Sequence, residues 1–326
     1  LSTFSPRSNF VQRVREVNGL EKLGKALGLQ LTCSAAKVEV DMRIGVLQLD
    51  DVRLGFEYKE GDGVPLVFMG GVTSTTATWE PVLERLGTSR PVYLLDHRGH
   101  GRSSHIASGD YSNWVGQVSD TCQFLERVSG RSVVIGHSQG GIQAFYATAQ
   151  KPELVAGLYL EDISPHFVAH QRHVGSAFIA ALKNIGLELR QALAADEKGS
   201  EMAARIAGVS LGDGITFGDV RPDEQLQIMA DGVLQMDPKI FDTFFEDDSV
   251  PPFELAETIR AIQCPIHIAC GAPELGALFL ESDLDDLHDK GCEATSTKFG
   301  DVGHSVHFDA LELFVQDLAA FLERVD

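Results

Sequence analysis

The chain has 326 residues, of which 44% are hydrophobic and 23% are charged, a composition typical of a globular protein. It carries 47 acidic and 27 basic side chains, so its formal net charge at pH 7 is −20. This charge argues against a protein that binds nucleic acid or anionic lipid, because both need clustered Lys and Arg. The five cysteines have no CxxC spacing and predict neither a disulfide framework nor a zinc site.

Residues 1–39 predict an extension that precedes the main domain. Apolar side chains recur there every three or four residues, as on one face of a helix, at Phe10, Val14, Val17, Leu20, Leu23 and Leu27. We favour a helix that packs on the rest of the protein; the alternative is an amphipathic segment for targeting or for a membrane surface. No apolar run is long enough for a signal sequence or a transmembrane helix. We therefore expect a cytoplasmic protein without stable membrane insertion, with a trimmed targeting segment as the alternative.

Short strands and helices alternate between residues 40 and 164. Antiparallel strands are predicted at residues 37–40, 44–49 and 52–58. Apolar runs typical of buried parallel strands follow at residues 65–69, 91–95, 132–135 and 154–160. Helices are predicted between these strands at residues 79–86, 113–128 and 139–150.

The strand pattern stops in residues 165–258. This segment predicts several helices, rich in Phe and Met and broken at Gly186, at Gly199 and at residues 208–218 and 237–238. Strands return at residues 265–269 and 295–299, and a last helix follows at 311–325. We predict an α/β fold with a mostly parallel central sheet flanked by helices. Residues 40–164 and 259–326 would form its core, and residues 165–258 would form an inserted helical cap.

A candidate catalytic serine lies between a predicted strand and a predicted helix. Residues 136–141 read GHSQGG, which fits the G-x-S-x-G pattern in the strand–turn–helix context that it requires. Side chains two residues from Ser138 would collide in so tight a turn, which explains the glycines. The helix N-terminus also provides N–H groups that can stabilise the negative charge that develops during the reaction. We predict that Ser138 is a nucleophile.

A serine hydroxyl needs a base to activate it. His304 lies in a loop between the last predicted strand and the last predicted helix, at the same edge of the sheet as Ser138. We predict that His304 is the general base. His97 and His100 belong to an earlier loop, and we interpret them as structural.

The motifs of this chain and their order along the sequence resemble those of the α/β-hydrolase superfamily, in its branch of capped, serine-esterase-like proteins. The resemblance covers roughly residues 40–326 apart from the cap, and it rests on MGG at 69–71, DHRGHGRS at 96–103, the serine turn and GH at 303–304. It implies the α/β-hydrolase fold and an oxyanion hole made by the N–H groups of Gly71 and Gln139. Many relatives have His-Gly where this chain has Met69 and Gly70, so one polar anchor of the loop is absent.

The acid that orients His304 has two main candidates. After the strand 265–269 the family usually shows Gly-x-x-Asp, and Glu274 stands at the matching place. Asp162 follows an earlier strand, at a position that some relatives use. A glutamate can orient an imidazole after a small backbone shift. We favour Glu274 over Asp162, because Asp162 also matches a common structural aspartate of these relatives. Asp283 and Asp301 are weaker alternatives.

Together these residues predict a serine hydrolase that cleaves a carboxylic ester, thioester or lactone through an acyl-enzyme intermediate, without cofactor or metal. The Phe- and Met-rich cap predicts a lid over an apolar pocket, and therefore a small-molecule substrate with an apolar acyl or aromatic group. The alternatives are a carbon–carbon bond hydrolase or acyltransferase with the same triad, and a ligand receptor on a hydrolase scaffold. The oligomeric state is left open.

Overall fold

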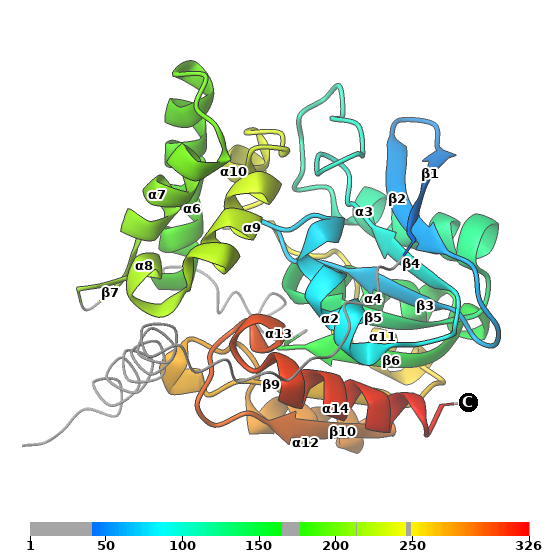
Figure 1. Cartoon of the computed structure of the whole chain (residues 1–326). Coiled ribbons are helices and arrows are strands. Elements are labelled where there is room, and N and C mark those ends of the chain that lie inside the picture. Colours follow the sequence, from blue (N-terminus) through cyan, green and yellow to red (C-terminus); the bar gives the residue numbers. More distant parts are fainter. Residues whose placement is uncertain (1–40, 165–176, 213, 246–248, 326) are drawn as a thin grey trace, which may run out of the picture.

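The computed structural model describes residues 41–164, 177–212, 214–245 and 249–325. Its main element is an eight-stranded sheet in the order β1-β2-β4-β3-β5-β6-β9-β10 (Figure 1). The strands are β1 (Arg43–Gln48), β2 (Arg53–Lys59), β3 (Leu66–Met69), β4 (Val92–Leu95), β5 (Ser132–His137), β6 (Val155–Glu161), β9 (Ile266–Cys270) and β10 (Ala294–Lys298). The predicted N-terminal helix and the strand predicted at 37–40 lie outside the described residues.

Six neighbouring strands of the sheet, from β4 to β10, run parallel. Only β1 and β2 run antiparallel to their neighbours. The carboxyl ends of the parallel strands therefore meet at one edge, where sheets of this kind place their sites. The expected mostly parallel α/β sheet is confirmed.

Apolar side chains fill both faces of the sheet, because alternate residues of a strand point to opposite sides. In β3, Leu66 and Phe68 enter one core cluster, whereas Val67 and Met69 enter the other. Helices cover both faces, as Figure 1 shows. They are α2 (Glu80–Leu86), α13 (Val306–Asp309) and α14 (Leu311–Leu322) on one side, and α3 (Trp114–Phe124), α4 (Ser138–Gln150), α11 (Leu255–Ala261) and α12 (Glu281–Asp289) on the other.

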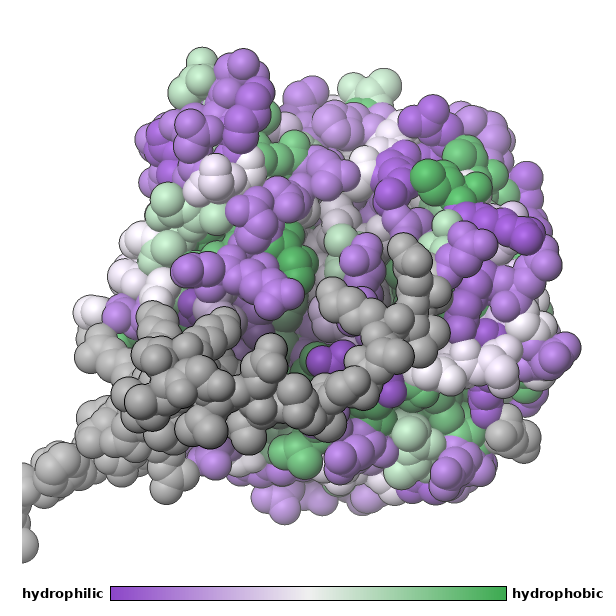
Figure 2. Space-filling model, viewed as in Figure 1, coloured by the Kyte–Doolittle hydropathy of each residue, from purple (hydrophilic) through white to green (hydrophobic). Residues whose placement is uncertain are grey.

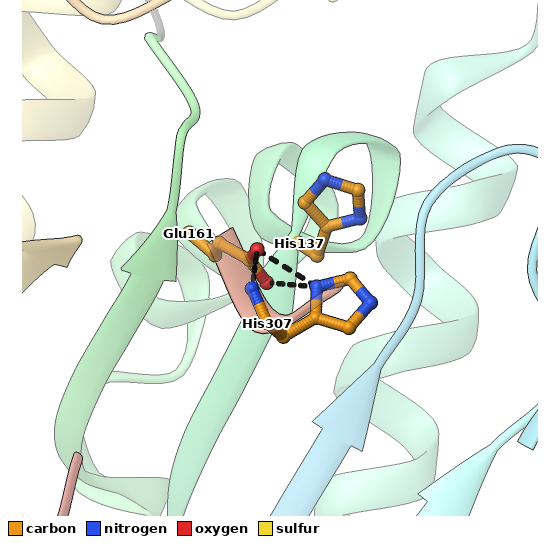
Figure 3. A group of neighbouring side chains, drawn as sticks. All are labelled: His137, Glu161 and His307. Carbon is orange, nitrogen blue, oxygen red and sulfur yellow. Dashed lines mark hydrogen bonds and ion pairs between the residues drawn. The ribbon is translucent and has the colours of Figure 1, made fainter. Parts of the chain in front are cut away.

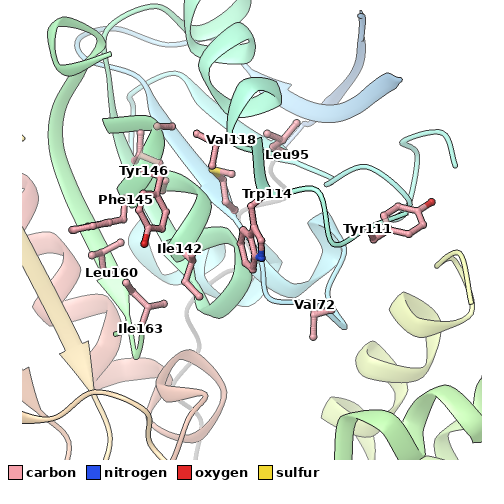
Figure 4. Packing of buried hydrophobic residues seen from close by; sticks show 14 of the residues in the cluster. Val72, Leu95, Tyr111, Trp114, Val118, Ile142, Phe145, Tyr146, Leu160 and Ile163 are labelled. Carbon is pink, nitrogen blue, oxygen red and sulfur yellow. The ribbon is translucent and has the colours of Figure 1, made fainter. Parts of the chain in front are cut away.

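The larger cluster centres on α4, which follows β5. Figure 4 shows Ile142, Phe145 and Tyr146 of this helix near Trp114 and Val118 of α3. All five side chains are buried. This packing holds the first turn of α4 in a constant position relative to the sheet.

The chain between β6 and β9 forms a separate group of helices, which we call the cap. Its elements in the described part are α6 (Ala177–Ala194), α7 (Gly199–Gly208), α8 (Phe217–Val220), α9 (Asp223–Val233) and α10 (Ile240–Thr243), with a small hairpin of β7 (Ser210–Gly212) and β8 (Ile215–Thr216). The sequence did not predict this hairpin. Figure 1 shows the cap helices beside the sheet, whereas α11 packs against α4 in the core.

One expected helix break is absent from the cap. Helix α6 continues through Gly186, where a break was predicted. A Cβ atom on Gly186 would lie 2.4 Å from the ring of Phe241. The glycine therefore allows α6 to approach α10 closely, and it does not end the helix.

None of the helices in the described ranges is long and apolar enough to cross a membrane.

Candidate active site

Ser138 begins α4 directly after the last residue of β5. Its φ is 51°, a left-handed conformation that is strained for a residue with a side chain. The turn closes only because its neighbours are glycines: a Cβ on Gly136 would lie 2.5 Å from Gly141 Cα, and one on Gly140 would lie 2.6 Å from Gly70 O. This is the geometry expected of a nucleophile at a strand-to-helix turn.

Asp162 follows the strand next to that of Ser138. Strands β5 and β6 are parallel neighbours, and His137 pairs with Glu161 at their ends, so Ser138 and Asp162 leave the sheet side by side. Asp162 also has a positive φ, 42°. Its carboxylate is buried and accepts hydrogen bonds from the amides of Leu278 (2.9 Å) and Phe279 (3.4 Å).

His304 is hydrogen-bonded to Asp162. The two side chains meet with 2.7 Å between Nδ1 and Oδ2. Burial raises the pKa of the Asp162 carboxyl, and the hydrogen bonds from His304 and from the two amides oppose that shift. The bond leaves Nε2 as the imidazole atom available to a reacting group.

Glu274, our first choice for the acid, takes no part in this arrangement. It lies in the turn Pro273–Leu275 after β9, and its side chain is exposed. The carboxylate hydrogen-bonded to His304 Nδ1 is that of Asp162. Asp162, the alternative from the sequence, therefore replaces Glu274 as our candidate acid.

The loop after β3 lies against the serine. A Cβ on Gly71 would lie 3.3 Å from Ser138 Cβ. The carbonyl of Gly70 accepts hydrogen bonds from the amide of Gly140 (3.0 Å) and from His97 Nε2 (2.8 Å). The loop is thus attached to the first turn of α4, where Gln139 lies.

The histidines of the 96–103 loop support the same segment. His100 Nε2 donates to the carbonyl of Val72 at 2.7 Å, two residues beyond Gly70. Burial lowers the pKa of His97 to about 4, so its imidazole is neutral at pH 7 and donates through Nε2. These two side chains provide the polar anchorage that the sequence suggested was lost with the His-Gly pair.

A narrow pocket of about 50 Å³ opens on these residues. The core contributes Gly71, Ser138 and His304 to its lining, and the cap contributes Leu182, Phe217, Arg221 and Met229. Figure 2 shows a hollow between the cap and the core, with hydrophobic residues inside it. The residues predicted as nucleophile, base and first oxyanion donor therefore face one cavity. Sequence analysis did not find Arg221, because the cap has no motif.

A second group of ionisable side chains, which sequence analysis missed, lies beside the pocket, and one of its members, His137, belongs to the pocket lining. His137, Glu161 and His307 are buried together (Figure 3). His307 donates to Glu161 from Nδ1 (2.7 Å) and from its amide (2.8 Å), and His137 donates from Nε2 to the carbonyl of His304 (3.2 Å). In the sequence, His137 precedes Ser138, Glu161 precedes Asp162, and His307 follows His304 by three residues. Only this closeness in sequence could have indicated the group.

Two histidines and a carboxylate also occur in metal sites. The ligand atoms of His137, Glu161 and His307 lie within 4.8 Å of one another. Ligands of a tetrahedral zinc lie about 3.3 Å apart, given bonds of about 2.0 Å. Since Glu161 and His307 already share a short hydrogen bond, we interpret the group as a hydrogen-bonded cluster.

A protein-family model described as alpha/beta hydrolase fold matches residues 64–181. This segment contains the loop at Gly70, the serine turn and Asp162. This segment of the chain therefore resembles the α/β-hydrolase family, and the chain has the α/β-hydrolase fold. Its solved neighbours share the fold: a carboxylesterase structure from Nitrososphaera gargenis has a TM-score of 0.67 at 18% identity, and the match covers 87% of this chain and 98% of that chain.

Two curated relatives of this chain have names that describe ester cleavage. The sn-1-specific diacylglycerol lipase ABHD11 of Danio rerio is 33% identical over 129 residues, which are 39% of each chain. A pimeloyl-[acyl-carrier protein] methyl ester esterase of Aliivibrio fischeri is 24% identical over 273 residues, which are 81% of this chain and 96% of that protein. The first curated relatives are matched over about two fifths of their own length.

Proposed function

We propose that this protein is a serine hydrolase that cleaves a carboxylic ester through an acyl-enzyme intermediate. The observation that carries the proposal is the strained Ser138 at the start of α4, in one pocket with a His304 that is hydrogen-bonded to the buried Asp162. The names of a lipase, a methyl ester esterase and a carboxylesterase among its relatives support an ester over a carbon–carbon bond.

In this mechanism His304 Nε2 takes the proton of Ser138 as Oγ attacks the carbonyl carbon. Asp162 holds the imidazole in the tautomer with a proton on Nδ1 and stabilises the imidazolium that forms. The N–H groups of Gly71 and Gln139 would stabilise the oxyanion. His304 then protonates the leaving alcohol and activates a water molecule that releases the acid. Thioesters and lactones present the same carbonyl to this sequence of steps.

The walls of the pocket suggest the size and polarity of the acyl group. Leu182, Phe217 and Met229 of the cap and Phe308 of the core line it. About 50 Å³ is far below the volume of typical ligand pockets, about 300–1,000 Å³, so the cap has to move to admit a long chain. We propose a small substrate with a short, mainly apolar acyl group.

Labelling with a fluorophosphonate probe tests the proposal. The wild type should react with one equivalent of probe, and Ser138→Ala should lose the label. Ser305→Ala is a matched control, because Ser305 lines the same pocket and should leave labelling intact. A wild type that neither reacts with the probe nor hydrolyses short acyl esters would contradict the proposed function.

A further inference from the structure

Arg221 places a basic side chain in the pocket of a protein that is acidic overall. The protein has 20 more acidic than basic side chains, yet the described lining of the pocket contains no Asp or Glu. It contains one arginine and no lysine among the described residues. Arg221 is therefore the only Lys, Arg, Asp or Glu side chain in the described lining of the cavity that holds Ser138.

Arg221 belongs to the cap but reaches the core. It follows α8, and its side chain is only 10% exposed. Its Nη1 donates to Asp309 (2.5 Å) and to Gln225 (3.2 Å), and its guanidinium lies 5.3 Å from the centre of the Phe308 ring. Phe308 and Asp309 belong to α13, which follows His304 by two residues.

The Nε atom of Arg221 is buried, and no described residue accepts a hydrogen bond from it. A buried charged donor without an acceptor is unfavourable, because it has lost its hydrogen bonds to water, so such groups are rare unless a ligand completes them. A guanidinium binds a carboxylate best with two parallel N–H donors, and only Nη1 is committed to Asp309 and Gln225. An acceptor from outside the chain can therefore complete this side chain.

We propose that Arg221 binds a carboxylate of the substrate, so that the preferred substrates are esters whose acyl chain ends in a carboxylate. The inference rests on the proposed function of Ser138 and adds an acid group to the apolar acyl chain. Leu182, Phe217 and Met229 would contact the carbons between the two ends of that chain. A carboxylate fits a pocket of this size because it is flat and contains only three heavy atoms.

A purely structural role for Arg221 makes a different prediction. Its bond to Asp309, together with the bond from Gln225 Nε2 to the carbonyl of Phe308 (2.8 Å), could serve only to attach the cap to α13. Removal of either Arg221 or Asp309 would then affect all substrates alike. If Arg221 binds the substrate, loss of Arg221 weakens the preference for acidic esters, whereas loss of Asp309 removes a competing carboxylate.

The test compares matched esters in the full-length protein. The acidic series consists of the monomethyl esters of butanedioic, pentanedioic and hexanedioic acid, and the neutral series of the methyl esters of butanoic, pentanoic and hexanoic acid. Proton release gives kcat/KM for each, and the ratio of acidic to neutral ester is taken at equal chain length. The wild-type ratio should exceed one for at least one length. Because the ratio is taken within each variant, partial loss of folded protein cancels.

Arg221→Met should lower this ratio about 10- to 100-fold, as expected for one charge-assisted hydrogen-bonding group, and Arg221→Lys should lower it less. Asp309→Asn should leave the ratio unchanged or raise it. Arg190→Met is the matched control, because Arg190 is a cap arginine bound to Asp242 and Pro238 outside the pocket lining; its ratio should equal that of the wild type.

An unchanged ratio in Arg221→Met, or an equal fall in Arg221→Met and Asp309→Asn, would overturn the inference. If Ser138 still reacts with the fluorophosphonate in that case, the proposed function stands without it. Loss of wild-type labelling would instead overturn the proposed function.

Discussion

His304 Nδ1 lies 2.7 Å from Asp162 Oδ2, although 142 positions separate the two residues in the chain. The contact joins the turn after β6 to the loop after β10. Strand β9 lies between these two strands in the sheet, so both loops must extend across its end for the side chains to meet. The two amide donors of residues 278 and 279, in the segment after β9, hold the carboxylate in this position.

Asp162→Asn should lower kcat by about 10⁴-fold, because an amide no longer selects the tautomer with a proton on Nδ1. Glu274→Gln is the matched control and should leave kcat near the wild-type value, since Glu274 is exposed and His304 Nδ1 is hydrogen-bonded to Asp162. Steady-state hydrolysis of a short ester measures both. The reverse result, with activity lost only in Glu274→Gln, would restore Glu274 as the acid.

Glu161→Gln tests the buried cluster behind the site. Glu161 accepts hydrogen bonds from the amide and from Nδ1 of His307, and it lies close to His137 and His304. Burial raises the pKa of Glu161, while its neighbouring histidines and amide donors oppose that shift and favour the carboxylate. A buried negative charge stabilises the imidazolium that His304 becomes when it accepts the proton of Ser138. Its removal should therefore lower kcat.

Steady-state hydrolysis of a short ester measures this loss. Asp317→Asn is the matched control. Asp317 lies on α14, outside the pocket lining, and accepts a hydrogen bond from His267 (2.8 Å), so its loss should leave kcat unchanged. A Glu161→Gln variant with the kcat of the wild type would show that the cluster does not act on His304.

Buried neutral histidines should make the protein sensitive to acid. Burial lowers the pKa of His97 to about 4 and those of His137 and His307 to about 3. Between the unfolded-state pKa near 6.5 and these folded-state values, the unfolded chain binds more protons, so the free energy of unfolding falls as pH decreases. Each such histidine contributes about 1.4 kcal/mol per pH unit to the slope in this window.

His97→Gln removes one of these groups but keeps an N–H donor for the carbonyl of Gly70. Urea unfolding at pH 7, 6 and 5 should therefore show a smaller pH slope than in the wild type. His105→Gln, at a side chain that is 54% exposed, should leave the slope unchanged. Equal slopes in all three proteins would refute the assignment of His97 as a buried neutral donor.

Two glycine substitutions in the cap should change stability in opposite directions. Gly186→Ala should lower the free energy of unfolding by about 1–3 kcal/mol, because its methyl group would overlap the Phe241 ring. Gly208→Ala should raise it by about 0.5–1 kcal/mol, because Gly208 ends α7 with open space at its Cβ position. Urea unfolding measures both. Stabilisation by Gly186→Ala would mean that α6 and α10 are not in close contact.

The α/β architecture was predictable from the sequence because each of its signals is local. Apolar runs predicted β3 to β6 to within a few residues, and the glycines around Ser138 identified a strand-to-helix turn within six positions. The placement of His304 at the same sheet edge as Ser138 also followed from the order of strands and helices. Each of these patterns reflects the backbone conformation or the burial of a single element. Both are determined largely by residues that are close together in the sequence.

The choice of acid, the buried cluster and the charge of the pocket became visible only in three dimensions. Asp162 and Glu274 both follow strands that end at one edge, so the choice between them depends on which carboxylate reaches His304. His137, Glu161 and His307 come together because the ends of β5 and β6 pair and α13 packs beside them. Arg221 enters the pocket through the packing of the cap on the core. Such contacts join residues far apart in the chain, and no local pattern encodes them.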